Sequence, residues 1–427
     1  MQKYFKNECV RKRCHILGML ERQAGEKHLS FHTPGHKIAG YDITELSYSD
    51  NLSCPNGVLL RAEQDLASIL GADVSFLLTD GSTAGVLSML YALKLKGCKK
   101  IAAPVLSHKS FYNGCALLGL TPIVFETPTL ALPLSLLAKD VEESLTQADA
   151  LMITSPDYYG NVADLQGIAE LCKRQNKPFI VDGAHGGHLH YHKELHAGAH
   201  ADMWVDGVHK SLPALTQGAV VSAKAELASV LKTAVDAFRT TSPSYPIMAS
   251  VEYAVKYPEN KALEQRIEYI KQTKKYVYKN ADYTKLCIFA KNGFEVERLA
   301  QKQGIYLEFA QQNAVCFYLS PAQEEGDVQQ LLLFLEALEK QGLLLDEKSV
   351  QQDPAPVKLM EVQGKEVEKI PLSEADGRVS ARVCGLFPPC LPLVRKGERM
   401  TKEKIEALMA ASNRFGVEDN QITVVKE

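Results

Sequence analysis

The run Phe179-Ile-Val-Asp-Gly-Ala-His185 leads from three apolar residues to an aspartate, Asp182. A second run, Met203-Trp-Val-Asp-Gly-Val-His-Lys210, places a lysine just after another apolar segment. Short runs of this kind are typical of strands that are buried on both faces of a parallel sheet. Ligands of such sheets bind where the strands end, at their carboxyl edge. We therefore expect Asp182 and Lys210 to belong to one site at that edge.

The surrounding sequence alternates between helical and extended patterns. It predicts helices over 60–71, 83–97, 110–119, 138–147, 164–175 and 223–236. It predicts strands over 75–79, 101–105, 122–126, 150–155, 178–182, 203–206 and 219–222. Strands that alternate with helices predict an α/β fold with a mostly parallel sheet that is covered on both faces.

The composition changes after about residue 260, where long charged helices predominate. We expect helices over 260–282 and 326–341, strands near 304–309 and 314–319, and a last helix near 401–412. This pattern predicts a smaller α+β C-terminal part beside the major domain. The expected domains are an N-terminal helical and loop segment (1–45), a large domain around Asp182 and Lys210 (46–259), a small α+β domain (260–345) and a C-terminal domain (346–427).

The overall composition is that of an ordinary globular protein, with 46% hydrophobic and 23% charged residues and a net charge of −3. No basic block or stripe occurs, which argues against nucleic acid or an anionic membrane as the main partner. The ten cysteines are scattered without zinc-ligand spacing, so a reduced, cytoplasmic protein is expected. We expect no signal peptide, because the first 20 residues are charged throughout and have no continuous apolar stretch. No segment approaches the roughly 20 apolar residues of a membrane span.

Asp182 and Lys210 are the pair that a pyridoxal 5′-phosphate (PLP) site requires. The lysine amine forms a Schiff base with the cofactor aldehyde, and the aspartate keeps the pyridine nitrogen protonated so that the ring accepts electrons. A carboxylate buried at a strand end is costly unless it is paired, and the pyridinium would be its partner. An aspartate that only caps a helix or binds backbone amides is the structural alternative. His209, next to the lysine, is a candidate for proton relay or phosphate contact.

Two more segments follow predicted strands. In Thr79-Asp-Gly-Ser-Thr-Ala-Gly85, Gly81 permits a tight turn, while Ser82 and Thr83 offer hydroxyl and N–H groups to a phosphate at a helix N-terminus. Simple helix capping is the alternative for this segment. In Ser107-His-Lys-Ser110, the ring of His108 could stack on the pyridine, whereas the commoner role for a lone loop histidine is a local hydrogen bond.

The segment after Asp182 is rich in histidine. His185 can approach the same pocket, and five more follow at His188, His190, His192, His196 and His200. A metal site is one interpretation of such a run. A single nearby acid and loose spacing do not define a ligand set, so no metal is expected.

In this order, the motifs make the chain resemble the Orn/Lys/Arg decarboxylase family of fold-type-I PLP enzymes, in a short form without the additional N-terminal wing domain. The resemblance extends over most of the chain. It rests on Phe31-His-Thr-Pro-Gly-His-Lys37, Thr79-Asp-Gly-Ser-Thr-Ala84, Ser107-His-Lys-Ser110, Ser155-Pro-Asp-Tyr-Tyr-Gly160, Val181-Asp-Gly-Ala-His-Gly186, His209-Lys-Ser-Leu-Pro-Ala-Leu-Thr-Gln217, Thr241-Ser-Pro-Ser-Tyr-Pro246 and Pro388-Pro-Cys-Leu-Pro392.

The resemblance implies a PLP-dependent enzyme that decarboxylates lysine, ornithine or arginine, with Lys210 as Schiff-base lysine and His209 beside it. The residues that it assigns to the cofactor are Lys210, Asp182, His108, His185, Gly81, Ser82 and Thr83. The loop 240–244, with Thr240 and Ser242, would reach the cofactor of a neighbouring subunit. A homodimer with shared active sites is therefore implied.

The chain departs from the family pattern at four positions. Gly183 stands where an acid usually follows the ring aspartate, and Asp157 stands where a small hydroxyl residue is usual. Gly207 replaces a hydroxyl residue two before the His-Lys pair, and Cys390 replaces a glycine between the C-terminal prolines. The change at Gly207 would remove a phosphate ligand and weaken cofactor binding. The changes at Gly183 and Asp157 bear on the identity of the substrate.

Two other functions stay open at this point. An aminotransferase or lyase on the same scaffold would need an arginine for the substrate α-carboxylate, for which the candidates are Arg239, Arg378 and Arg382. A PLP-binding protein without turnover, acting as a sensor or structural partner, would fit the departures. In a decarboxylase of basic amino acids, an acid should meet the distal cation of the substrate, and Asp157 and Glu308 are the candidates.

Overall fold

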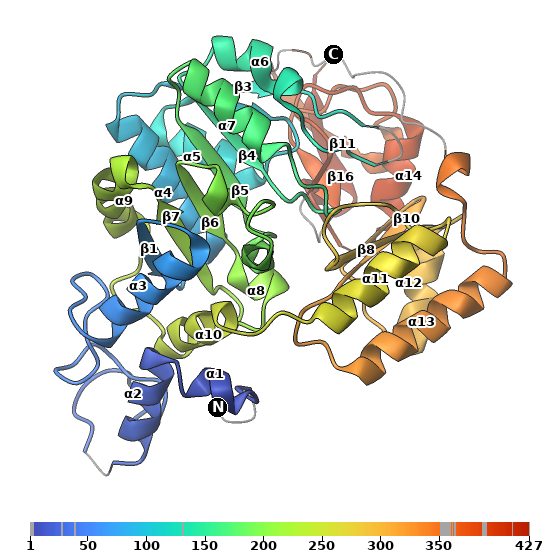
Figure 1. The fold of residues 1–427 in the computed structure, drawn as a ribbon. Helices are drawn as coiled ribbons and strands as arrows, with labels where there is room; N and C mark the ends of the chain where they lie inside the picture. The colour runs from blue at the N-terminus through green and yellow to red at the C-terminus, as the bar shows by residue number, and fades with distance from the viewer. Residues whose placement is uncertain are drawn as a thin grey trace. The chain divides into compact units, whose positions relative to one another are not determined.

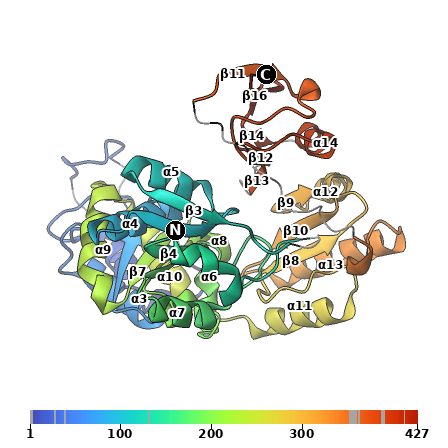
Figure 2. The same ribbon diagram turned by 90° about the horizontal axis from the view of Figure 1, so that it is seen from above.

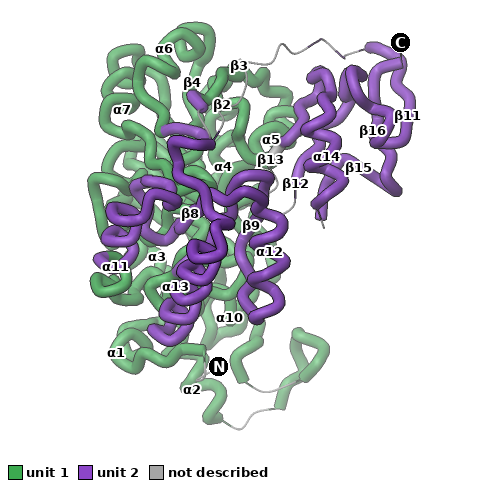
Figure 3. The backbone as a smooth tube through the Cα atoms, turned by 90° about the vertical axis from the view of Figure 1, so that its right-hand side faces the viewer, with its two compact units in different colours: residues 1–127, 135–264, 320–322 green, residues 128–134, 265–319, 323–427 purple. Residues whose placement is uncertain are grey.

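The structure is a computed structural model that describes residues 4–26, 29–37, 40–129, 132–350, 360, 362, 364–386, 391–411 and 413–426. Figures 1 and 2 show its elements from two directions. The chain divides into two compact units, which Figure 3 distinguishes by colour. Unit 1 comprises residues 1–127, 135–264 and 320–322, and unit 2 comprises residues 128–134, 265–319 and 323–427.

Unit 1 is built on a seven-stranded sheet with the strand order β1-β7-β6-β5-β4-β2-β3 (Figure 1). Its strands are β1 (Val74–Leu78), β2 (Lys100–Pro104), β3 (Thr121–Phe125), β4 (Ala150–Thr154), β5 (Phe179–Gly183), β6 (Met203–Asp206) and β7 (Ala219–Ala223). Only β7 runs against its neighbours, since it is antiparallel to both β1 and β6. The predicted mostly parallel sheet is therefore confirmed, and each predicted strand lies within one residue of the observed one at either end.

Helices cover both faces of this sheet because successive strand side chains point to opposite sides. Phe76 and Leu78 belong to one apolar core, whereas Leu77 between them belongs to the other. The first core includes α4 (Gly81–Leu95), α5 (Lys109–Leu118) and α9 (Ala225–Phe238). The second includes α2 (His15–Ala24), α3 (Val58–Leu70), α6 (Ala138–Thr146), α7 (Leu165–Arg174) and α10 (Tyr245–Val255).

Helix α4 lies unusually close to the sheet at Gly85. A β-carbon at this position would stand 2.5 Å from Val205 Cγ2 on β6, so a larger residue would push the helix away. The start of α4 is thereby held near the end of β6. The helical character expected near the N-terminus is present as two pieces, α1 (Glu8–Arg11) and α2.

Short helical elements follow the two central strands. η1 (Gly187–Tyr191) and η2 (Ala197–Ala199) come after β5, and α8 (Val208–Ser211) comes directly after β6. No helix in the part of the chain that the structure describes is long and apolar enough to cross a membrane.

Unit 2 contains a three-stranded antiparallel sheet in the order β8-β10-β9. Its elements are α11 (Lys261–Thr273), which begins at the end of unit 1, β8 (Lys285–Phe289), α12 (Gly293–Lys302), β9 (Phe309–Gln311), β10 (Ala314–Tyr318) and α13 (Glu325–Lys340). The prediction of one helix over 260–282 was wrong, because α11 ends at Thr273. Beyond it Tyr276 and Tyr278 pair with β8, through Phe289 N–H to Tyr276 O (2.8 Å) and Tyr278 N–H to Cys287 O (2.9 Å).

The C-terminal part of unit 2 holds two further three-stranded sheets, β11-β16-β15 and β13-β12-β14. Their elements are β11 (Val367–Pro371), β12 (Cys384–Leu386), β13 (Leu391–Val394), α14 (Lys402–Ala410), β14 (Arg414–Phe415), β15 (Val417–Glu418) and β16 (Gln421–Val425), with η3 (Glu347–Ser349) and η4 (Leu372–Glu374). The expected α+β character of this part of the chain is confirmed. β8 and α12 were not predicted.

Candidate active site

The predicted cofactor residues gather at one edge of the unit 1 sheet. Strands β2, β4, β5 and β6 are parallel neighbours, and β1 runs in the same direction because β7 is antiparallel to both β1 and β6. Ser82, His108, Asp182 and Lys210 lie at or just beyond the carboxyl ends of β1, β2, β5 and β6. This is the edge at which ligands bind in open parallel sheets.

Asp182 and Lys210 lie on neighbouring strand ends with His185 beside them. Lys210 Nζ is 3.4 Å from His185 Nε2. Asp182 is 2% exposed, and its Oδ1 accepts a hydrogen bond from Ala184 N–H at 3.1 Å. Burial raises the pKa of Asp182, although the charge of Lys210 and the Ala184 N–H act in the opposite direction. A cation placed against this carboxyl would hold it ionised.

His108 is held as a neutral imidazole. It caps α5, and its Nδ1 accepts hydrogen bonds from Ser110 N–H (3.2 Å) and from the Ser110 side chain (2.8 Å), so this nitrogen carries no proton. Burial, followed by the charges of Lys210 and Lys109, lowers the pKa of His108 to about 4. Hydrogen bonds to Nδ1 lie in the plane of the imidazole ring. His108 can therefore bind Ser110 and still offer a ring face for stacking on the pyridine.

The segment after β1 fits a phosphate group. Ser82 is buried at the start of the 15-residue helix α4, and its Oγ has no hydrogen-bond partner among the described residues. Gly81 adopts φ +74°, and its N–H donates to Gln217 O at 2.9 Å, while Thr83 is exposed. A buried hydroxyl without a partner at a helix N-terminus is what an anionic ligand would satisfy.

His209 has a defined tautomer. Its Nδ1 lies 3.0 Å from Gly218 O, a carbonyl that can only accept, so Nδ1 carries the proton. Its backbone N–H donates to the same oxygen at 3.1 Å. Burial lowers the pKa of His209, partly opposed by the bond to Gly218 and reinforced by Lys210. The other nitrogen, Nε2, is thus available as a proton acceptor next to the lysine.

The loop that contains Thr240 and Ser242 lies beside the start of α4 in its own chain. Thr240 N–H donates to Asp80 Oδ2 at 3.3 Å, and Ser242 N–H donates to Thr240 Oγ1 at 3.1 Å. Helix capping was the alternative role for the segment that contains Asp80. Asp80 is the N-cap residue of α4, but its side chain makes no capping hydrogen bond to the helix.

Tyr158 is a second neighbour of the site that the sequence analysis did not single out. Its ring centroid lies 4.7 Å from that of His185, and both residues are buried.

Asp157, next to Tyr158, is bound within its own turn. It accepts hydrogen bonds from the N–H groups of Tyr159 (2.8 Å) and Asn161 (2.9 Å) and from Asn161 Nδ2 (2.8 Å). Burial raises the pKa of Asp157 to about 6. These internal bonds disfavour Asp157 as the partner of a substrate cation, and Glu308 belongs to unit 2.

The three arginines considered for an aminotransferase already bind acids. The side chain of Arg239 is 4% exposed and contacts Glu63 (3.5 Å) and Asp236 (3.3 Å). Within unit 2, Arg378 lies 2.6 Å from Glu368, and Arg382 lies 3.7 Å from Glu418. Their carboxylate partners disfavour a role in binding the substrate α-carboxylate.

Two of the departures from the family pattern are sterically enforced. A β-carbon at Gly183 would stand 2.9 Å from Val205 O and 3.4 Å from Asp206 Oδ1, so an acid has no room there. Asp206, 1% exposed, accepts hydrogen bonds from His196 Nε2 (3.2 Å) and Trp204 Nε1 (3.1 Å). A β-carbon at Gly207 would meet Ala184 O at 2.3 Å. Cys390 lies outside the described residues.

Several residues of the histidine-rich segment bind protein groups. His190 Nδ1 lies 2.6 Å from Gly187 O, and His200 Nε2 lies 3.0 Å from Glu194 O. Among the described residues, two groups of three side chains could offer metal ligands, namely His15, Asp65 and Glu252, and His192, Glu259 and Glu264. In the first group, Lys256 Nζ already lies 2.6 Å from Asp65 and 2.8 Å from Glu252. In the second, His192 Nε2 lies 3.0 Å from Glu264, as in an ordinary ion pair.

The strand order and the residues at its carboxyl edge define the chain as a PLP-dependent enzyme of fold type I. The model of the Orn/Lys/Arg decarboxylase major domain matches residues 18–324, and the model of the C-terminal domain of the same family matches residues 340–417. The chain belongs to the Orn/Lys/Arg decarboxylase family. It is therefore an amino-acid decarboxylase whose cofactor is PLP.

Known relatives extend along almost the whole chain. The arginine decarboxylase of Bacillus subtilis (strain 168) is 28% identical over 451 residues, which cover 90% of this chain and 91% of that protein. The arginine decarboxylase of Bacillus anthracis is 27% identical over 416 residues, covering 87% and 84%. Among solved structures, the constitutive lysine decarboxylase of E. coli superposes with a TM-score of 0.70 at 17% identity, covering 97% of this chain and 82% of that one. The serine palmitoyltransferase of Sphingomonas wittichii gives 0.57 at 14%, covering 78% and 85%.

Proposed function

We propose that the chain decarboxylates a basic amino acid, with arginine as the preferred substrate, at the carboxyl edge of the unit 1 sheet. The observation that carries the proposal is a buried carboxyl, Asp182, at the end of β5, with Lys210 just beyond the end of the neighbouring strand β6. The arginine decarboxylases that align with about nine-tenths of the chain support the choice of arginine.

The side chains at this edge fit each part of PLP. Lys210 would hold the aldehyde carbon, and Asp182 the ring nitrogen, whose positive charge would ionise the buried carboxyl. The neutral ring of His108 would lie on the pyridine, and Ser82 Oγ would bind the phosphate. Gly81 and the N–H groups at the start of α4, including that of Thr83, would complete the phosphate site.

When bound, PLP supplies an electron sink for the pair of electrons that remains on the substrate Cα as CO2 leaves. After CO2 leaves, the substrate Cα needs a proton. Lys210, as an ammonium once it is free of the cofactor, or His209 would donate that proton. His209 holds one proton on Nδ1 against Gly218 O, so it could donate from Nε2 only after this nitrogen has taken up a second proton. His185, 3.4 Å from Lys210 Nζ, accepts a hydrogen bond from the amine and orients it.

We further propose a cytoplasmic homodimer in which Thr240 and Ser242 contact the cofactor of the partner subunit. The support comes from the family resemblance of the segment Thr241-Ser-Pro-Ser-Tyr-Pro246 and from the position of this loop beside Asp80 at the start of α4. Sedimentation analysis of the PLP-loaded protein tests the assembly, and a monomer with full activity would contradict it.

The decisive experiment combines cofactor trapping with product detection. Wild type, Lys210→Ala and a control, Lys173→Ala at an exposed position of α7, are incubated with PLP, treated with borohydride and weighed by mass spectrometry. Covalent PLP is expected on wild type and the control and not on Lys210→Ala. CO2 release is then measured with arginine, lysine and ornithine, and the highest kcat/KM is expected for arginine.

The possible outcomes separate the parts of the proposal. Trapped PLP on Lys210→Ala would remove Lys210 from its proposed role. Trapped PLP without CO2 from any basic amino acid would contradict the substrate class, and a preference for lysine or ornithine would contradict only the choice of arginine.

A further inference from the structure

Unit 1 contains a cavity between α1, α2 and α3 that shares no residue with the proposed PLP site. Its volume is about 440 Å³, within the range of small-molecule sites. Basic side chains dominate its lining, which includes Arg11, Lys12, His15, Arg22 and Arg61. The cavity therefore has the size and the lining of an anion site.

The positive charge of this lining is only partly neutralised. Arg11 pairs with Glu21 at 2.6 Å, and Lys12 pairs with Glu8 at 2.7 Å. Those two acids are the only carboxylates of the lining. The exposed side chains of Arg22 and Arg61 have no ion pair or hydrogen bond within the described part of the chain. Two guanidinium groups thus face the cavity without a counter-charge, in a chain whose net charge is −3.

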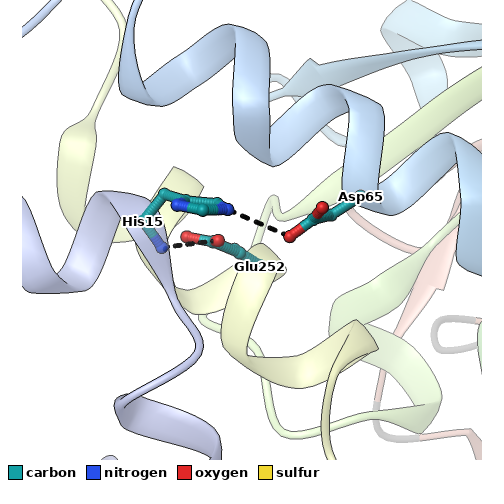
Figure 4. Close-up of side chains that lie close together, drawn as sticks. All are labelled: His15, Asp65 and Glu252. Carbon is teal, nitrogen blue, oxygen red and sulfur yellow. Dashed lines mark hydrogen bonds and ion pairs between the residues drawn. The ribbon is translucent and has the colours of Figure 1, made fainter.

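Two acids outside the lining, Asp65 and Glu252, contact the lining residue His15 and are already bound to other groups. His15 Nε2 lies 3.1 Å from Asp65, and Glu252 accepts the N–H groups of His15 (2.7 Å) and Ile16 (2.9 Å), as Figure 4 shows for the side chains of His15, Asp65 and Glu252. Lys256 Nζ lies 2.6 Å from Asp65 and 2.8 Å from Glu252. These carboxylates cannot turn to neutralise the arginines without breaking this network, which also fixes α2 against α3 and α10.

A glycine on α2 leaves room between the basic groups. His15, Gly18 and Arg22 are three and four residues apart, so they share one face of the helix. A β-carbon at Gly18 would stand 3.7 Å from Arg22 Nη1, which places the guanidinium over the glycine. Glycine inside a helix costs about 1 kcal/mol relative to alanine. Here the missing side chain keeps the floor of the cavity open beneath the arginine.

We propose that this cavity binds a small phosphate-bearing anion, with Arg22 and Arg61 as its main ligands. The planar guanidinium fork matches two oxygens of a phosphate, and hydrogen bonds between ionised partners are the strong class. His15 and Arg11 line the same space, but His15 Nε2 is bound to Asp65 and Arg11 Nε and Nη2 are bound to Glu21, so Arg22 and Arg61 carry the binding. The site is separate from the seat of the cofactor phosphate at Ser82.

Pyrophosphate is the probe for this site, titrated calorimetrically into the PLP-loaded holoenzyme so that the cofactor phosphate seat is filled. One bound pyrophosphate per chain is expected, with an affinity that falls as sodium chloride is raised, because exposed charges are screened. Arg22→Gln and Arg61→Gln should each weaken binding about tenfold or more. The matched control, Arg174→Gln, removes an exposed arginine of α7 outside the cavity and should leave the affinity unchanged.

A second variant tests the cavity in case the arginine variants fail to fold. Gly18→Glu replaces glycine by a good helix former and places a carboxylate four residues before Arg22. It should keep or raise the melting temperature and abolish pyrophosphate binding. Absence of pyrophosphate binding to wild type, unchanged binding in both arginine variants, or undiminished binding in Gly18→Glu would each overturn the proposal. Equal affinity for citrate, a tricarboxylate of similar charge at neutral pH, would overturn the assignment to phosphate.

Discussion

A β-carbon at residue 207 would stand 2.7 Å from Ser82 Oγ, so the side chain of Ser82 and any side chain at residue 207 compete for the same space. Gly207 lets the turn after β6 lie directly against the N-terminus of α4. The sequence comparison suggested that Gly207 simply removes a phosphate ligand. The structure indicates instead that the glycine makes room for Ser82, whose hydroxyl has no partner among the described residues.

Restoring a hydroxyl residue by Gly207→Ser should therefore weaken PLP binding by about tenfold or more and not strengthen it. Overpacking of this kind costs about 1–3 kcal/mol, because the backbone oxygen of Ala184 would also have to move. Fluorescence titration with PLP and urea unfolding measure the two effects. The control is Gly326→Ala on α13, where a β-carbon meets nothing within 4 Å and a small gain in stability is expected. Tighter PLP binding by Gly207→Ser would show that residue 207 can act as a ligand after all.

Removal of the Ser82 hydroxyl should weaken PLP binding without lowering the stability of the PLP-free protein. We expect Ser82→Ala to bind PLP about tenfold more weakly, as for loss of a charge-assisted hydrogen bond. The stability of the PLP-free protein should not fall, because this hydroxyl has no described partner to lose. Ser88→Ala on the same helix is the matched control: its Oγ donates to Ala84 O at 2.8 Å, so stability should fall slightly while PLP affinity is kept. Equal PLP affinities of Ser82→Ala and wild type would contradict the phosphate assignment.

Asp182→Asn should raise the stability of the PLP-free protein and lower the activity of the PLP-loaded enzyme. Burial raises the pKa of Asp182, so the PLP-free fold favours its protonated form, and its contribution to stability is lost as pH rises through the folded pKa. A neutral amide avoids this loss. The PLP-free variant should therefore be more stable than wild type by about 1 kcal/mol at pH 7, while kcat of the loaded enzyme falls by about a hundredfold or more. Calorimetry at pH 5 and pH 7 checks the sign, since the difference should shrink at the lower pH. A less stable PLP-free variant at pH 7 would show that the carboxylate is paired without the cofactor.

His108 should make the fold sensitive to acid. Its pKa is lowered to about 4, so its contribution to stability is present above pH 6.5 and is lost as pH falls toward 4. One titrating group changes the unfolding free energy by at most about 1.4 kcal/mol per pH unit. His108→Asn keeps a residue that caps helices well and removes the titration. Urea unfolding from pH 7.5 to 4.5 should show a shallower decline in the variant, with equal pH slopes above pH 7. His190, whose pKa is also lowered to about 4, should leave part of the decline in both proteins.

The strands and helices of unit 1 could be predicted because the evidence for them is local. Apolar runs such as Phe179–Val181 are short and bounded, and the helical periodicity between them is regular. The helix expected over 260–282 was wrong because its end depends on a distant segment. Tyr276 and Tyr278 form backbone hydrogen bonds with β8, and their own sequence contains no signal for that partner.

The candidate site divides in the same way. The sequence by itself determined that Asp182 and Lys210 each follow a short apolar run, and hence that both are expected at the carboxyl edge of a parallel sheet, because the chain direction fixes where a strand ends. That these two strands are neighbours was decided by the tertiary structure. Only the tertiary structure decided which groups have room and which already have partners. It shows that the missing side chain at Gly207 leaves room for Ser82. It also shows that Asp157 is bound within its own turn and that Arg239 is paired with Glu63. These relations join residues far apart in the chain or depend on the path of a loop. They follow from close packing, which fixes distances that no local pattern contains.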